Sequence, residues 1–171
     1  MKLHFVLIAG LALITGACAN QNPYEVTVSH CPALAVLGDA GTVTRFIGGG
    51  RDIQDVAYTA TISSAVQNCT EHSDGINTIV EFDIVATRGA ALTNREVTLQ
   101  YFVAVMKDNS QLVSKKVFDV TLNFNASTGT AASHQVIKSL IPTLEQSKRY
   151  DYETLLGFQI TNDEAAYNIA R

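Results

Sequence analysis

Apolar and polar residues alternate with a period of two along five segments of this chain. Every even position from 80 to 86 is apolar, and Glu81 and Asp83 stand between them. Successive side chains of a strand point to opposite faces, so this period predicts strands with one buried face, and helical spacing fits none of the five segments. The other four apolar faces are Val56, Tyr58, Ala60, Ile62 and Val66; Val97, Leu99, Tyr101, Val103 and Val105; Leu112, Phe118, Val120, Leu122 and Phe124; and Tyr150, Tyr152, Leu156, Phe158 and Ile160.

Turn-forming residues separate these segments. Asp108, Asn109 and Ser110 make a link short enough for a hairpin, so the strands on either side of it are expected to pair antiparallel. Shorter strands are expected at 25–29, 33–37 and 42–47. Further turn signals occur at 38–39, 48–50, 73–75, 88–89 and 125–129.

Two segments near the C-terminus have other patterns. The segment 133–144 contains apolar residues at helical spacing, but Pro142 would end a helix there, and we favour a strand with an irregular edge. Thr161 and Glu164 have the spacing of a capping box ahead of an alanine-rich stretch. The sequence therefore predicts one short helix at the end of the chain.

These elements fit one all-β domain over residues 25–171. The chain has 171 residues, 47% of them hydrophobic and 16% charged, which excludes a disordered protein and suffices for a single core. Regular short strands without intervening helices predict an antiparallel, immunoglobulin-like or fibronectin type III-like sandwich of about seven to eight strands. The likeness to these domains concerns only the arrangement of the strands in two layers and implies no common ancestry. The chain has no tryptophan, and Cys31 and Cys69 are too close in sequence for the intersheet bridge of antibody domains.

The first residues have the form of a secretory signal. Lys2 precedes an apolar run at 5–14, which is too short to span a membrane, and residues 1–17 are interpreted as a signal peptide. The segment Thr15-Gly16-Ala17-Cys18 resembles the lipobox of bacterial lipoproteins. We expect Cys18 to carry the lipid and residues 18–24 to be a short tether. Since Ala19 and not aspartate follows the cysteine, the expected location is the periplasmic face of the outer membrane.

The remaining cysteines form an even pair. With Cys18 acylated, Cys31 and Cys69 are expected to form a disulfide in an oxidising compartment. The alternative is a metal site in which His30 and His72 join the two thiols. Their spacing matches no standard zinc pattern, so no metal is expected.

Four segments resemble those of a family of alphaproteobacterial envelope lipoproteins. They are GGGRDIQDVAYTATI (48–62), TLQYFVAVMKD (98–108), KKVFDVTLNF (115–124) and YETLLGFQITNDEAAYN (152–168). The resemblance covers roughly residues 45–168. The resemblance implies a signal peptide and a lipidated cysteine, and it offers no activity that can be transferred to this chain.

The glycine loop at 48–50 is the main candidate for ligand binding. Its backbone N–H groups, together with Arg51 and Asp52, could form a nest for an anion. It lacks the Gly-Lys-Ser/Thr ending of a phosphate loop and is expected to lead into a strand. The simpler interpretation is a glycine turn with Arg51 and Asp52 paired at the surface.

No catalytic constellation is visible in the sequence. No G-x-S-x-G motif occurs, and His30, His72 and His134 lie in or beside predicted turns, where each is interpreted as a solvated side chain. The carboxylate pairs Glu81 with Asp83 and Asp151 with Glu153 lie on polar strand faces and are interpreted as surface charge. We therefore expect no enzyme and no cofactor.

Two hypotheses about function follow. The first is a membrane-tethered, noncatalytic sandwich that serves as an envelope structural or protein-interaction module. The alternative is a periplasmic lipoprotein that binds a small ligand or a metal. A formal net charge of −4 and a pI near 5.5 offer no basic surface for nucleic acid, which is excluded as a partner.

Overall fold

The computed structural model describes residues 31–141 and 152–170. The expected signal peptide, Cys18, the tether, the expected strand at 25–29 and Tyr150 lie outside these residues. The strands are β1 (Ala33–Val36), β2 (Thr42–Phe46), β3 (Val56–His72), β4 (Gly75–Arg88), β5 (Glu96–Lys107), β6 (Gln111–Asn123), β7 (Thr130–Ile141) and β8 (Tyr152–Phe158). A 3-10 turn, η1 (Ile53–Asp55), precedes β3, and the helix α1 (Asn162–Ile169) ends the described chain.

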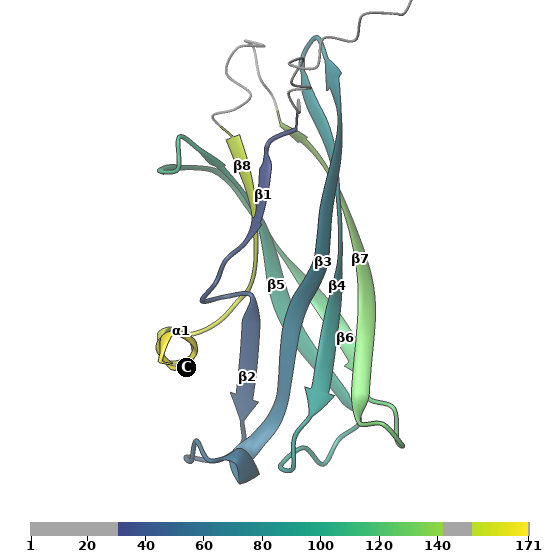
Figure 1. Ribbon diagram of the computed structural model, residues 1–171, viewed down its shortest axis with the longest axis vertical. Coiled ribbons are helices and arrows are strands. Elements are labelled where there is room, and N and C mark those ends of the chain that lie inside the picture. Colours follow the sequence, from purple (N-terminus) through teal and green to yellow (C-terminus); the bar gives the residue numbers. More distant parts are fainter. Residues whose placement is uncertain (1–30, 142–151, 171) are drawn as a thin grey trace, which may run out of the picture.

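The strands form two four-stranded sheets that face each other (Figure 1). Sheet A has the order β1-β8-β5-β6, and sheet B has the order β2-β3-β4-β7. All pairs are antiparallel except β1 with β8, which is parallel. The chain passes from sheet A to sheet B between β1 and β2. The prediction of an antiparallel β-sandwich with a short C-terminal helix is confirmed.

The core lies between the two sheets. Phe82 and Ile84 of β4 are fully buried, and alternation along this strand agrees with the expected apolar face. The ring of Tyr101 on β5 meets Phe82 edge to face at a centroid distance of 5.3 Å and stacks on Phe118 of β6 at 5.3 Å. Aromatic contacts across the interface therefore join the inner faces of both sheets.

The predicted apolar face of β3 is wrong beyond Ile62. The strand continues to His72, and Val66, expected on the buried face, is 52% exposed. Ser64 adopts a positive φ of 55°, and the pairing with β4 shifts between Ser63 and Val66. This bulge adds one residue to β3, and because side chains alternate with period two, every later side chain moves to the opposite face.

The hairpin between β5 and β6 is confirmed, with Asp108 and Asn109 both at positive φ in its turn. Leu112, expected on the buried face, is 55% exposed. The pairing shifts between Val105 and Met106, and the tip of the hairpin diverges from sheet B (Figure 1). An apolar residue at this tip therefore has no opposing sheet to pack against.

The predicted C-terminal helix is confirmed, and the segment predicted as a strand at 133–144 is a strand as far as Ile141, although its pairing with β4 shows no irregularity and 142–144 lie outside the described residues. Residues 130–141 form β7, at the edge of sheet B. Thr161 is the N-cap of α1, where its hydroxyl accepts from the backbone N–H of Glu164 and the Glu164 carboxylate accepts from the backbone N–H of Thr161. This capping box satisfies backbone donors at the start of the helix.

Candidate functional site

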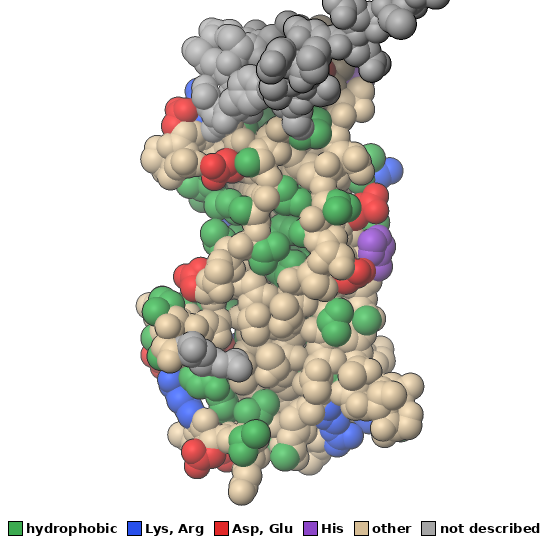
Figure 2. Space-filling view, viewed as in Figure 1, with side chains coloured by type: hydrophobic (Ala, Val, Ile, Leu, Met, Phe, Trp, Pro, Cys, Tyr) green, Lys and Arg blue, Asp and Glu red, His purple; other side chains and the backbone are tan. Residues whose placement is uncertain are grey.

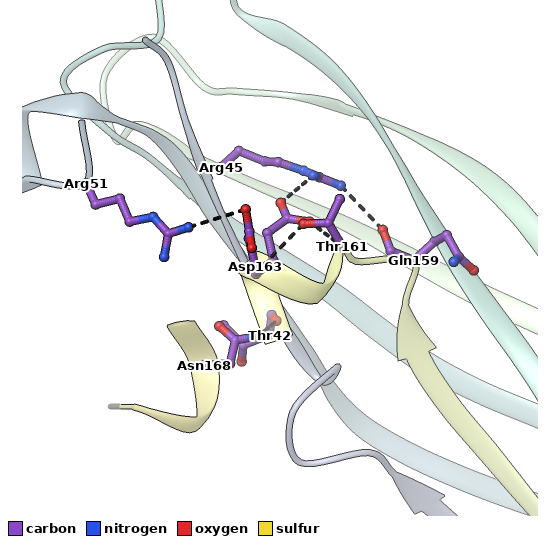
Figure 3. A network of polar contacts seen from close by, with 8 residues as sticks. Thr42, Arg45, Arg51, Gln159, Thr161, Asp163 and Asn168 are labelled. Carbon is purple, nitrogen blue, oxygen red and sulfur yellow. Dashed lines mark hydrogen bonds and ion pairs between the residues drawn. The ribbon is translucent and has the colours of Figure 1, made fainter. Parts of the chain in front are cut away.

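Polar contacts fasten α1 to β2 and to the loop that follows β2 (Figure 3). Arg45 forms an ion pair with Glu164 and donates to the backbone carbonyl of Gln159 at 3.4 Å. The side-chain amide of Asn168 donates to the carbonyls of Asp39 and Thr42, both at 2.7 Å. The helix is thus held at both ends against the edge of sheet B.

Arg51 and Asp52 do not pair with each other as expected. The Arg51 guanidinium lies 3.8 Å from the Asp163 carboxylate on α1, whereas Asp52 is the N-cap residue of η1. The side chain of Asp55 accepts from the backbone N–H of Asp52 at 3.2 Å. The glycine loop therefore leads into a 3-10 turn before the strand begins, and Asp52 helps to form that turn while Arg51 turns toward the helix.

Arg51 also lines a cleft of about 520 Å³ on the outer face of sheet B, here called the arginine cleft. Arg88 also lines the cleft, but it pairs with the core residue Tyr58, so its side chain leaves β4 on the inner face, where Nε and Nη2 donate to the carbonyl of Leu92 at 3.0 and 2.5 Å. None of the described residues that line the cleft is acidic. Figure 2 shows two groups of basic side chains near the lower end of the molecule, with uncharged surface between them.

Threonines form the floor of the arginine cleft. Thr44, Thr59 and Thr87 stand side by side on β2, β3 and β4, and the hydroxyls of Thr44 and Thr59 are 3.3 Å apart. Tyr167 of α1 lies at one wall. The Arg51 guanidinium beside these hydroxyls can bind an anionic or hydroxyl-rich small molecule, because both kinds of group supply directed hydrogen bonds. Sequence spacing gave no sign of this row, since its members come from three strands.

The predicted disulfide between Cys31 and Cys69 is present, with an S–S distance of 2.00 Å. Cys31 stands just before β1 of sheet A, and Cys69 is on β3 of sheet B, so the bond ties the two sheets together. The sequence predicted the bond itself but did not predict that it would join the two sheets. Gln67 adds a hydrogen bond of 2.9 Å to the carbonyl of Pro32 at the same place.

The disulfide also bears on the alternative metal site. Both sulfurs are bonded to each other and cannot act as thiolate ligands in this form. His72 ends β3 on the surface, and His30 lies outside the described residues. Within residues 31–141 and 152–170, no group of three or more His, Cys, Asp or Glu side chains is placed to hold a metal ion.

His134 lies within β7 and not in or beside a turn as expected, and its side chain is 57% exposed, in agreement with the expected solvated side chain. It stands opposite Asp83 in the pairing of β4 with β7, and its Nδ1 lies 2.8 Å from the Asp83 carboxylate. Its Nε2 lies 3.9 Å from Glu81. Glu81 and Asp83 project to one face as expected. Asp151, from the second expected carboxylate pair, lies outside the described residues.

Two buried tyrosines have raised pKa values. Burial raises the pKa of Tyr101, whose hydroxyl donates to the side-chain oxygen of Gln135 at 2.8 Å. Burial also raises the pKa of Tyr58, an effect that the nearby Arg45 guanidinium opposes. Both hydroxyls therefore remain neutral hydrogen-bonding groups near neutral pH.

Among the described residues, no helix has the length and apolar character needed to cross a membrane. Comparisons with known proteins returned no matching family model, no matching curated protein and no matching solved structure.

Proposed function

We propose that this chain is a lipid-anchored, noncatalytic β-sandwich of the bacterial cell envelope. Cys18 attaches it to the periplasmic face of the outer membrane, and the sandwich acts as a structural or protein-interaction module. The observation that carries the proposal is the Cys31–Cys69 disulfide. Disulfides persist in the periplasm and are rare in the cytosol, so the bond agrees with export by the sequence at 1–17.

The lipobox-like Thr15-Gly16-Ala17-Cys18 supports the anchor. Since Cys31 and Cys69 bond to each other, Cys18 is left as the odd cysteine, which in an exported protein calls for a separate chemical use. Acylation supplies that use. The resemblance of four segments to alphaproteobacterial envelope lipoproteins points the same way.

The polar groups of the sandwich support a noncatalytic function. Arg45 and Glu164 hold α1 in place, and Asp52 and Asp55 form the turn before β3. The His134–Asp83 pair lies on the exposed outer face of sheet B, where both side chains are at least 40% exposed. A general base there would be fully hydrated and without a pocket to hold a substrate.

The arginine cleft favours a second candidate function, the binding of a small anionic ligand in the periplasm. Arg51 gives the cleft a positive charge beside its row of threonine hydroxyls, with the Asp163 carboxylate 3.8 Å from the guanidinium. Recovery of one envelope protein after crosslinking in cells would favour the interaction module. Native mass spectrometry that finds a small anion retained on the purified protein would favour the ligand carrier.

The anchor is tested by fractionating cells that produce the wild type or Cys18→Ser. The wild type is expected in the membrane pellet, and Cys18→Ser is expected to leave it, because the acyl chains bury many CH₂ groups at about 0.8 kcal/mol each. Cys31→Ser is the matched control, since it also replaces one cysteine but keeps the anchor, and it should stay with the membranes. Equal pelleting of Cys18→Ser and wild type would contradict the proposal.

A further inference from the structure

A second cleft, here called the edge cleft, opens between the two sheets on one flank of the sandwich. It has a volume of about 470 Å³ and is lined by residues of β5, β6 and β7. β6 is the edge strand of sheet A, and β7 is the edge strand of sheet B. The cleft therefore lies where the two edge strands leave the interior of the sandwich open to solvent. Its volume is within the size range of small-molecule sites.

The surfaces of the edge cleft are largely apolar. Val103 and Val105 of β5 contribute buried side chains, and Phe118 and Ile137 pack against the core from the two edge strands. Leu140 at the rim is 51% exposed. An apolar surface that runs from solvent into the core favours a ligand with a hydrocarbon part.

The charges on the edge cleft are all positive. Lys116 and Lys138 line it together with Ser114 and Ser139, and none of the described lining residues is acidic. Lys116 pairs with Val103 and so shares the inner face of sheet A, whereas Lys138 pairs with Ile79 on the outer face of sheet B and reaches the cleft only at its rim. Its neighbour Lys115 projects from the opposite face, with Nζ 4.2 Å from the centre of the Phe102 ring.

The edge cleft lies at the disulfide end of the sandwich. Ser139 pairs with Thr78, and Thr78 pairs with Cys69, so the three residues form one row across sheet B. The disulfide fastens one flank at this level, whereas the β6–β7 flank is open. Beside Val105, the buried hydroxyl of Thr154 has no hydrogen-bond partner among the described residues. The interior here therefore contains a buried hydroxyl group that none of the described residues satisfies.

We propose that the edge cleft binds a long-chain fatty acid. The hydrocarbon chain lies against Val103, Val105 and Ile137, and Lys116 binds the carboxylate. The chain enters the described domain at Cys31, at this same end, so an anchor at Cys18 would hold the cleft toward the membrane. That orientation rests on the proposed function, whereas the binding does not.

Binding is measured by titrating the purified full chain carrying Cys18→Ser with cis-parinaric acid, a fluorescent long-chain fatty acid, below its micelle concentration. This variant has no thioether-linked lipid, so failure of the anchor proposal leaves the measurement intact. We expect saturable binding of one molecule per chain, displaced by palmitate but not by its uncharged methyl ester. Loss of the lysine contact in Lys116→Gln should weaken binding about tenfold.

Lys115→Gln is the matched control for Lys116→Gln, because the two exposed neighbours carry the same charge on opposite faces of β6. It should leave the affinity unchanged. Ser114→Trp should obstruct the cleft and abolish binding, while Val117→Trp on the outer face of sheet A should not. The proposal is overturned by an absence of saturable binding, by equal effects of the two single lysine changes, or by displacement with the methyl ester. An unchanged affinity in Lys116→Gln would also contradict the proposal. The charge of Lys116 would then serve to keep the edge strand β6 from pairing with another chain.

Discussion

Loss of the Cys31–Cys69 bond is expected to lower the free energy of unfolding by about 4 kcal/mol. The bond closes a loop with a sequence separation of 38 residues, and its removal returns conformational entropy to the unfolded chain. It also releases β1 of sheet A from β3 of sheet B. For a domain of this size, the melting temperature should fall by about 10 °C.

Calorimetry of the wild type and of Cys31→Ser with Cys69→Ser measures this effect. Reductant supplies the control, because it should lower the melting temperature of the wild type toward that of the double variant and leave the double variant unchanged. If the double variant has the same melting temperature as the oxidised wild type, the bond contributes little to holding the sheets together.

Phe82→Ala is expected to lower the free energy of unfolding by about 3–5 kcal/mol. Phe82 is fully buried, and its ring meets Tyr101 of the opposing sheet. Truncation removes the apolar contact and leaves a cavity that the surrounding strands can fill only in part. Denaturant titration followed by circular dichroism gives the size of the loss.

Val85→Ala is the control on the same strand. Val85 points to the outer face of sheet B and is 42% exposed, so the change should stay within about 0.5 kcal/mol. If the two variants lose similar stability, the inner face of β4 has been assigned to the wrong side.

Alternation was sufficient to predict strands such as β4, because a period of two follows directly from the pleat of a half-buried strand. It failed where the pleat is interrupted. The bulge at Ser64 exchanges the faces of β3, and a positive φ at serine leaves no mark in the hydropathy pattern. Val66 was consequently assigned to the wrong face.

The alternation of apolar and polar residues also did not predict that β5 is buried on both faces. Phe102 is 8% exposed on the outer face of sheet A, where it packs against Gly157. A Cβ on Gly157 would stand 2.8 Å from the Phe102 ring, so only glycine leaves room for it. This match of a phenylalanine with a glycine depends on the register of β5 with β8. The sequence of one strand alone does not specify that register.

The candidate sites depend on contacts between distant segments. The Arg45–Glu164 pair joins residues separated by 119 positions, and the arginine cleft unites Arg51 with Arg88 across sheet B. Short motifs identified Arg51 and the capping box, but they could not predict that Arg51 would lie beside Asp163 of the helix. The disulfide was predictable because only two cysteines remained to pair.

The most direct test of the account is the mass of the N-terminal peptide of the mature protein isolated from membranes. The account predicts a chain that begins at Cys18 and carries a diacylglycerol thioether on that sulfur. A peptide in which Cys18 is an unmodified thiol, or in which residues of the signal segment still precede it, would contradict the account.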